Sequence, residues 1–496
     1  MGVIQRQGIK HSIVNFTGLA IGTASTMFIY SQQEVVEAYG MVQYLMSIGI
    51  IGFPLFALSS NIVAIRFFPR FEDAAKGHHG FLPLILLMCL AGWGLCTLLV
   101  LPVWGSVHDF LARDSPLLQQ YLWMAVPFTL LFTLASVLYT YAVNFKRIVI
   151  PSILVEFSVK LFLPVQMLAI WIGWISLNTA VWWLTGHYLL VVIGMIVYLN
   201  HLGQWHWRPD WSFISPELRR DITRYAGFGI INGFALLVAT KADTLMVGSL
   251  TTMKSTGIYA IALNIAAAIE IPSKSMYGAS LSFVAKYLAD ENWTEMRILY
   301  QKVSINLLIA GFGVFGCVWL SANDLYALMP NSAEVSQGKY VLLFLGLSKL
   351  VDMGASLNNQ LVYYSNYYRY SMVSLVILAI ANIGFNIWLI PLLGLTGAAV
   401  ATLLSVTCYN LFSLYLVWQK FHIQPFTRET LKVCALGVAG MAVVWLVPLT
   451  AYPAVNILLR SGLYALLFGA LVLYTRVSPD INQLWSDFLL RWKKER

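Results

Sequence analysis

Fourteen apolar runs of about twenty residues each divide this chain of 496 residues, and they constrain its fold more than any other feature. About 20 apolar residues in a helix cross the roughly 30 Å of hydrocarbon in a bilayer. Hydrophobic residues make up 59% of the chain and charged residues 11%, against about 45–50% and about 25% in soluble proteins. This composition excludes a soluble globule and a disordered chain, and it predicts an all-α integral membrane protein with 14 transmembrane helices. The predicted spans are about 11–31, 41–65, 81–104, 120–144, 148–171, 177–200, 223–248, 256–280, 302–322, 340–364, 369–391, 395–419, 431–450 and 457–475.

Lysine and arginine are distributed unevenly among the connections between these spans. With a cytoplasmic N-terminus, 23 of the 31 basic residues fall in cytoplasmic segments, three fall on the other side, and the others lie within spans. Cytoplasmic loops carry an excess of Lys and Arg. The pattern therefore predicts a multi-pass protein with both termini in the cytoplasm, and it explains the net charge of +9 without a nucleic-acid partner.

Short segments repeat at long range with similar offsets. Gly40 matches Gly257 at an offset of 217, and residues 144–147 (NFKR) resemble residues 366–369 (NYYR) at an offset of 222. Six spans separate each pair, so the copies have parallel topology about an axis along the membrane normal. Two such lobes suit alternating access. The predicted organisation is an N-lobe (1–200, spans 1–6), a cytoplasmic linker (201–222), a C-lobe (223–420, spans 7–12), spans 13 and 14 (421–475) and an amphipathic basic tail (476–496).

Several charged side chains fall inside the predicted spans, where a lone charge at the bilayer centre costs about 2.5–3.5 kcal/mol on insertion scales. Three pairs are spaced to share a helix face, and they are Glu156 with Lys160, Glu270 with Lys274, and Lys349 with Asp352. Such pairs either neutralise one another and hold helices together, or line a wet cavity for an anionic head group and coupling ions. Lys241 and Asp243 are two residues apart, so each needs a partner elsewhere or water, unless both snorkel to the interface.

Amide side chains within spans indicate further polar surface, and the candidates include Asn232, Asn264 and Asn358. Amides hydrogen-bond sugar hydroxyls, and they equally bridge helices. Motifs for chemistry are missing from the sequence: there is no G-x-x-x-x-G-K-[ST] phosphate loop and no H-E-x-x-H. The sequence therefore predicts a transporter that does not hydrolyse ATP rather than an enzyme, with no catalytic residue, metal site or cofactor.

Four stretches carry a family resemblance: RQGIKHSIVNFTGLAIG, AIRFFPRFED, KADTLMVGSL with TGIYAIALNIAAAIEIP, and GLSKLVDMGASLNNQLVYYSNYYR. Together they resemble bacterial polysaccharide transporters, the Wzx-like oligosaccharide flippases of the multidrug/oligosaccharidyl-lipid/polysaccharide exporter (MOP) superfamily. The resemblance implies two six-helix lobes plus two helices, with spans 1, 2, 7 and 8 lining the main cavity. It implies movement of undecaprenyl-diphosphate-linked oligosaccharide from the cytoplasmic to the periplasmic leaflet of the bacterial inner membrane, for surface polysaccharide such as lipopolysaccharide. Implied partners are membrane lipids and the polysaccharide polymerase or chain-length machinery.

The resemblance and the embedded charges together define the candidate site. The candidates for binding diphosphate or sugar are Lys241, Lys274, Lys160, Lys349, Arg66, Arg70, Asn232, Asn264 and Asn358, with the two arginines at the cytoplasmic mouth. The candidates for coupling H⁺ or Na⁺ are Asp243, Glu270, Asp352 and Glu156. Spans 1 and 2 bear no charge in their cores, which departs from the family pattern and shifts charge recognition to the C-lobe and Lys160.

Two other functions are compatible with this composition. An ion-coupled multidrug/cation antiporter of the same superfamily favours a carboxylate-rich, aromatic cavity over one that bears lysines. A membrane-embedded glycan polymerase or acyltransferase needs a large outer loop or a deep His–acid pair, whereas the longest outer connections here are about fifteen residues.

Overall fold

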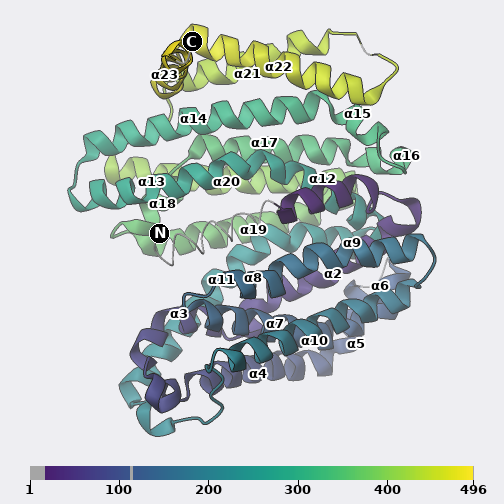
Figure 1. The fold of residues 1–496 in the computed structure, drawn as a ribbon, viewed down its shortest axis with the longest axis vertical. Helices are drawn as coiled ribbons and strands as arrows, with labels where there is room; N and C mark the ends of the chain where they lie inside the picture. Colours follow the sequence, from purple (N-terminus) through teal and green to yellow (C-terminus); the bar gives the residue numbers. More distant parts are fainter. Residues whose placement is uncertain (1–16, 112–114, 449, 495–496) are drawn as a thin grey trace. The chain divides into compact units, whose positions relative to one another are not determined.

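The computed structural model describes residues 17–111, 115–448 and 450–494, and 87% of the chain is helical, with no strand in these ranges. The chain divides into two compact units, Met1–Ala260 and Ile261–Arg496 (Figure 1). Each unit is built of helices that pack side by side, as the apolar runs predict.

In its described residues the first unit contains ten α-helices that end before residue 251, a helical stretch at 17–28 and the first half of α12. Within it, α2 packs on α11 and α7, and α7 packs on α4 and α10. The named helices are α2 (Gln33–Phe56), α3 (Ser60–Phe71), α4 (Phe81–Val100), α5 (Trp104–Leu111), α6 (Pro116–Tyr121), α7 (Ala125–Val143), α8 (Val149–Ser152), α9 (Ser158–Trp171), α10 (Leu177–His201), α11 (Pro216–Leu250) and α12 (Met253–Ala267), with the short turns η1 (Ala74–Gly80), η2 (Leu101–Val103), η3 (Leu122–Met124), η4 (Ile153–Phe157) and η5 (Trp211–Phe213).

The second unit holds the remaining helices. Its central members α14, α17 and α20 lie side by side, and α19 and α20 form a tight hairpin (Figure 1). The helices are α13 (Ile271–Ala289), α14 (Trp293–Leu320), α15 (Ala322–Ala327), α16 (Ser332–Val335), α17 (Lys339–Ala355), α18 (Asn358–Tyr364), α19 (Tyr368–Leu393), α20 (Leu395–Phe421), α21 (Arg428–Trp445), α22 (Pro453–Thr475) and α23 (Pro479–Lys494), with the 3₁₀ turns η6 (Ala268–Glu270) and η7 (Ser336–Gly338).

Eleven helices in the described ranges are long and apolar enough to cross a membrane, and a bent pair, 332–355 with 358–364, makes up to twelve. The predicted first span begins at residues 11–16, which lie outside the described residues, and continues as helix over 17–28. The predicted thirteenth span corresponds to α21, whose first two turns carry Arg428, Glu429 and Lys432. An all-helical membrane protein is confirmed, and the count of fourteen stays a prediction.

The predicted second span, 41–65, is wrong in its bounds. The chain forms two helices here, α2 and α3, because Leu58 and Ser59 adopt left-handed backbone conformations with φ of 45° and 52°. Pro54 lies four residues before this break, inside α2. A proline removes a backbone donor and clashes with the preceding turn, which disturbs a helix at that point.

α2 and the beginning of α12 cross at two glycines. Gly40 lies against the backbone of Met253 and Gly257, and Gly257 lies against the backbone of Val36. A Cβ on either glycine would overlap these backbone atoms. Small residues permit such close helix approach in membranes. The two residues are the pair that the long-range repeat matches.

The connection between α10 and α11, predicted as a linker, is fastened to η1. His78 Nε2 lies 2.7 Å from Gln204 Oε1, and His79 Nδ1 lies 3.2 Å from Asp210 Oδ2. The ring of His79 also stacks on Phe213, with centroids 3.9 Å apart. These contacts hold η5 and the residues around it at the N-terminal end of α4.

Asp210 is held ionised in this arrangement. The Ser212 hydroxyl donates to its carboxylate and, together with the neighbouring His79, lowers the pKa of this exposed side chain below its ordinary value of 3.8. The carboxylate therefore remains an acceptor throughout the neutral range.

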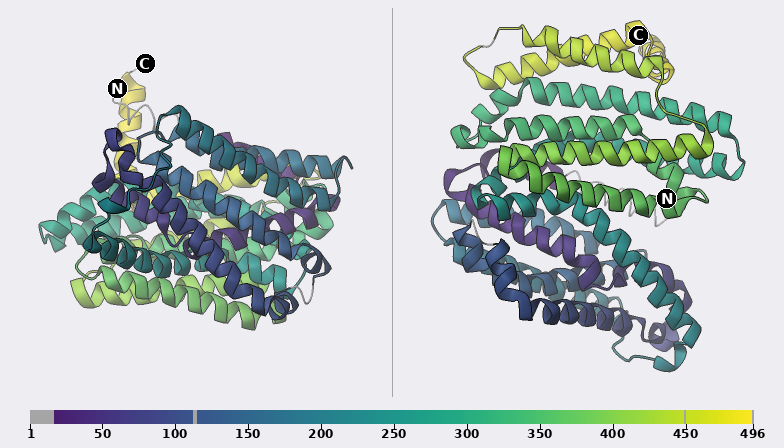
Figure 2. Two further views of the ribbon diagram at one scale, coloured as in Figure 1. Left: turned by 90° about the horizontal axis from the view of Figure 1, so that it is seen from below. Right: turned by 180° about the vertical axis from the view of Figure 1, so that it is seen from behind.

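α21 and α22 pack together on α14, at the edge of the second unit in the right-hand view of Figure 2. Tyr464 of α22 inserts beside Gly316 and Gly440, and its hydroxyl donates to the Phe312 carbonyl at 3.1 Å. The aromatic ring fills space that the two glycines leave open. The beginning of α23 is also tied to α14, because Asp480 accepts hydrogen bonds from that helix.

Candidate functional site

The second unit contains a helix that breaks in the middle of an apolar segment. α17 ends at Ala355 and α18 begins at Asn358, and the two segments are bent by 51°. Ser356 between them has φ 54° and ψ −118°, outside any helical region. Asn side chains compete with the helical backbone for hydrogen bonds, and three amides follow this break directly. Non-helical backbone at membrane depth occurs where it is buried in protein or lines a water-filled cavity.

Polar side chains from α17, α18 and α20 surround this break. Asn410 Nδ2 donates to Asp352 Oδ1 at 3.2 Å and to the Val406 carbonyl at 3.0 Å. Asn358, fully buried, has Nδ2 3.5 Å from the Asn410 carbonyl. The side-chain oxygens of Asn358, Asn410 and Ser356 are buried and accept no hydrogen bond within the described residues. Buried acceptors without a donor are costly, and they mark a site where a ligand or strain has to be considered.

An ion pair between two elements lies next to this break. Lys349 Nζ of α17 lies 2.5 Å from Glu270 Oε2 of η6, and about a third of each side chain is exposed (35% and 34%). Lys274, exposed on α13, interacts electrostatically with Glu270 as well. Asp352 is in turn coupled to Lys349 and Glu270. Four predicted site residues from two predicted spans therefore form one charged cluster.

This pairing differs from the sequence-based interpretation, which joined charges on the same helix. Neither Glu270 with Lys274 nor Lys349 with Asp352 forms an ion pair in the described part of the chain. The 3₁₀ turn η6 ends at Glu270, two residues before Pro272. Side-chain positions in a 3₁₀ turn do not follow the i,i+4 register of an α-helix. Glu270 is thereby directed toward α17.

The third expected pair is also not an ion pair within the described residues. Glu156 lies on the π turn η4, where it is exposed and close to Tyr139. Lys160 follows on α9, and its side chain lies against Gly18. A π turn contains one extra residue per turn, which rotates the side chains before it relative to those after it. The i,i+4 spacing consequently does not place these two charges together.

Lys241 and Asp243 lie on α11 in the first unit, and each finds a different environment. Asp243 is buried, with 4% of its surface exposed, and accepts a hydrogen bond from the Tyr259 hydroxyl at 3.1 Å. Lys241 is half-buried, and Asp243 contributes to its electrostatic environment. The expectation that Asp243 needs a partner beyond its own helix agrees with this geometry.

The two arginines of α3 contact the beginning of α11. The Arg66 guanidinium lies over the Tyr225 ring, 4.5 Å from its centroid, and Arg70 pairs with Asp221 at 3.5 Å. Both arginines are exposed. A role in substrate binding remains a prediction for them. Among the amides, Asn232 is half-buried on α11 and Asn264 is exposed on α12.

Sequence reasoning missed two groups of residues. Asn410 is a buried amide that donates a hydrogen bond to Asp352. The signal for it in the sequence was an amide in the middle of the apolar run 395–419. Glu34 and Glu37 lie in the first two turns of α2, because that helix starts eight residues before the predicted span. The expectation of an uncharged second span therefore applies only to its later turns.

The comparisons with known proteins agree with this architecture. The family model MatE matches residues 230–392. Among solved structures, the chain is similar to the lipid II flippase MurJ in an inward closed conformation, with a TM-score of 0.69 and 13% identity, over 95% of this chain and 100% of that one. It is also similar to a multidrug resistance MATE family transporter of the MOP superfamily in an outward-facing conformation, with a TM-score of 0.52 and 14% identity, over 85% of this chain and 95% of that one. The chain therefore shares the fold of these two proteins.

A relative found by sequence points in the same direction. The chain is 25% identical over 292 residues to the "Probable flippase AglR" of Haloferax volcanii. This alignment covers 56% of the chain and 60% of AglR, so the chain spans about three fifths of that relative. The homologues are transporters and flippases, and AglR is archaeal. The narrower assignment to bacterial polysaccharide export stays a prediction.

Proposed function

We propose that this protein is a flippase that moves a polyprenyl-diphosphate-linked oligosaccharide between membrane leaflets by alternating access, for surface polysaccharide synthesis. The observation that carries the proposal is the similarity to the lipid II flippase MurJ over the whole of that chain. The second relative, AglR, also bears the name of a flippase. The multidrug MATE transporter, by contrast, covers a smaller share of this chain at a lower TM-score.

The charged cluster of the second unit supplies groups suited to a diphosphate. Lys349 and Lys274 both act on Glu270, so the cluster brings two cations to the carboxylate on η6, and Asp352 is its second carboxylate. Lysine binds phosphate as a compact point charge. Because Lys349 and Glu270 are about a third exposed, an entering diphosphate competes with Glu270 for the lysine ammonium. When the diphosphate replaces Glu270, the Lys349 ammonium therefore keeps an anionic partner throughout the exchange.

The broken helix is the proposed coupling site for H⁺ or Na⁺. Asp352 is its carboxylate, and the unbonded side-chain oxygens of Asn358 and Asn410 lie on the elements that flank it. Hard cations take carboxylate, amide and hydroxyl oxygens as ligands. A proton on Asp352 would instead let this carboxyl donate a hydrogen bond to one of the same oxygens. H⁺ and Na⁺ are therefore alternative occupants of this one site. An ion at this position neutralises a charge three residues from Lys349 and thereby changes the affinity of that lysine for an anion.

The test is transport by the purified protein in proteoliposomes. A fluorescent polyprenyl-diphosphate oligosaccharide in one leaflet is exposed to a membrane-impermeant quencher, and the fraction that changes leaflet is measured over time. We expect rapid exchange with the wild type, a loss of tenfold or more with Lys349→Ala, and an unchanged rate with Lys286→Ala, a cation farther along α13. The diphosphate part of the proposal fails if Lys349→Ala and Lys286→Ala exchange the lipid equally fast.

The same vesicles separate the flippase from the multidrug antiporter. An antiporter would accumulate organic cations against an ion gradient and would leave the glycolipid where it was placed. Imposing a Na⁺ gradient or a pH gradient identifies the coupling ion, and Asp352→Asn is expected to abolish the response to that gradient. Gradient-driven drug uptake without glycolipid exchange would assign the protein to the antiporters.

A further inference from the structure

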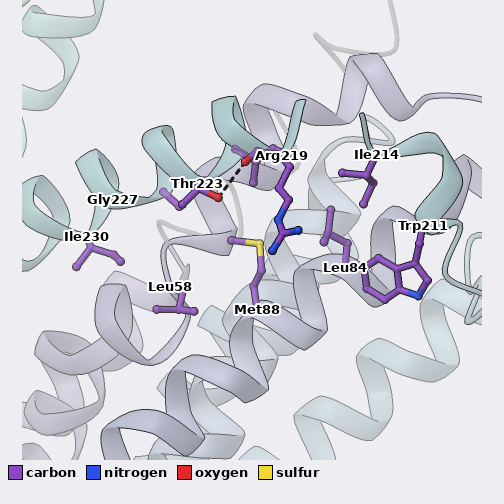
Figure 3. A pocket seen from close by; sticks show the side chains of 11 residues that line it. Leu58, Leu84, Met88, Trp211, Ile214, Arg219, Thr223, Gly227 and Ile230 are labelled. Atoms are coloured by element: carbon purple, nitrogen blue, oxygen red, sulfur yellow. Dashed lines mark hydrogen bonds between the residues drawn. The ribbon is translucent and has the colours of Figure 1, made fainter. Parts of the chain in front are cut away.

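A hollow of about 680 Å³ lies between α4 and α11 in the first unit (Figure 3). Leu84 and Met88 of α4 form one wall, and α11 forms the other. Ile222 and Ala226, each 6% exposed, are the buried part of the α11 wall. Volumes of about 300–1,000 Å³ are typical of ligand sites. No residue of the charged cluster described above lines this hollow.

The lining changes from polar to apolar along α11. Arg219 and Thr223 lie at the end where the helix begins, and Ile230 lies eleven residues after Arg219. At 1.5 Å per residue this is about 16 Å, or roughly half of a 30 Å hydrocarbon core. α4 begins at the same end, since Leu84 is its fourth residue. The hollow therefore has the length and the polarity of one leaflet of a bilayer.

Arg219 supplies a charge that has no carboxylate partner in the described part of the chain. Its side chain extends between Leu84 and Met88 in Figure 3. The nearby Asp221 is already paired with Arg70 at 3.5 Å. A guanidinium offers a fixed fork of donors that matches phosphate oxygens.

Trp211 closes the polar end of the hollow (Figure 3). It is the first residue of η5, which the contacts of His79 with Asp210 and Phe213 hold in place. Its side chain is 55% exposed. Tryptophan is enriched at the level of lipid head groups, where one side of the indole is apolar and the other is wet. The ordered loop thus places a residue typical of the interface beside the arginine.

We infer that this hollow binds one anionic phospholipid of the leaflet at which α11 begins, with the lipid phosphate on Arg219 and one acyl chain along Met88 toward Ile230. Three observations select this occupant: an unpaired cation at the membrane surface, an apolar trough of one-leaflet depth, and an interfacial tryptophan between head group and water. The lipid is distinct from the proposed cargo, because a single arginine without neighbouring amides suits one phosphate rather than a diphosphate that carries sugars.

The test is native mass spectrometry of the full chain titrated with phosphatidylglycerol or phosphatidylcholine of identical acyl chains. We expect one saturable site for phosphatidylglycerol on the wild type, and a loss of affinity of about tenfold or more with Arg219→Ala, because a charged hydrogen-bonded contact contributes about 1.5–3 kcal/mol. Arg220→Ala is the matched control, since it removes the same charge from the next residue, which does not line the hollow. Its affinity is expected to stay within about twofold of the wild type.

A second pair of variants tests the apolar part. Met88→Trp fills the trough and is expected to reduce phosphatidylglycerol binding, whereas Leu87→Trp, at a side chain 46% exposed outside the hollow, is expected to leave it unchanged. Retention of the wild-type thermal transition shows that each variant is folded. Equal losses with Arg219→Ala and Arg220→Ala, equal binding of phosphatidylcholine, displacement by soluble glycerol phosphate, or preferential binding of undecaprenyl diphosphate would each overturn the inference. None of these readouts depends on transport activity.

Discussion

Replacement of Gly40 by alanine tests the crossing of α2 and α12 quantitatively. The new Cβ overlaps the Met253 carbonyl and the Gly257 amide, both of which are backbone atoms that no rotamer change can move. Overpacking of this kind costs about 1–3 kcal/mol. Alanine also favours a helix over glycine by about 1 kcal/mol, which partly hides the overlap in a single measurement.

Gly94→Ala is the matched control for that gain. Gly94 lies inside α4, and no atom lies within 4 Å of the position of its Cβ. The helix propensity term is common to both variants, so the difference between them isolates the overlap, at about 1–3 kcal/mol.

The assay is unfolding in mixed detergent micelles, followed by circular dichroism over a range of denaturing detergent. We expect Gly94→Ala to unfold at the wild-type concentration or slightly above it, and Gly40→Ala to unfold clearly below. Gly257→Ala should behave as Gly40→Ala does, because its Cβ meets the Val36 backbone. If Gly40→Ala is as stable as Gly94→Ala, the two helices do not approach as closely as described.

Three further predictions concern polar contacts. Neutralising either Glu270 or Lys349 should lower the unfolding free energy by about 1 kcal/mol. This is closer to the value for exposed ion pairs than for buried ones, because a third of each side chain is accessible. In a double-mutant cycle of thermal stability, the charge-swapped double variant should recover most of the loss. Asn410→Leu removes the hydrogen bond to Asp352 and should lower unfolding stability by about 1–3 kcal/mol, with Asp352→Asn in the same background restoring part of the loss. The pKa of Asp210 is lower in the folded protein, so its stabilising contribution is complete above the ordinary value of 3.8 and is lost as the pH falls through the folded value. At pH 5, limited proteolysis of residues 201–215 should therefore be faster in Asp210→Asn than in the wild type. In stronger acid the two rates should converge.

Apolar length and charge asymmetry were sufficient to predict an all-helical membrane protein, because burial of a helix in hydrocarbon is the dominant constraint on such a chain. They were insufficient to place breaks within helices. Packing sets the backbone conformation at Leu58, where no glycine marks the left-handed residue, and at Ser356, where the amides follow rather than precede the break. The bounds of α2 and the bend after α17 consequently emerged only from the structure.

The candidate site shows the same division between composition and geometry. The sequence identified Glu270, Lys349 and Asp352 as embedded charges, since their cost in hydrocarbon is independent of the fold. It joined them wrongly, because the i,i+4 rule assumes a continuous α-helix and η6 interrupts that register at Glu270. Asn410 was missed for the complementary reason: a lone amide in an apolar run gains significance only when the fold brings it to a carboxylate.

The crossing of Gly40 and Gly257 also bears on the predicted lobes. The long-range repeat makes these two residues equivalent, and the structure places them in contact within the first unit. Close approach of two helices requires a small residue at the crossing whether or not the helices are repeats. The contact therefore explains why both positions carry glycine, and the two-lobe organisation stays a prediction.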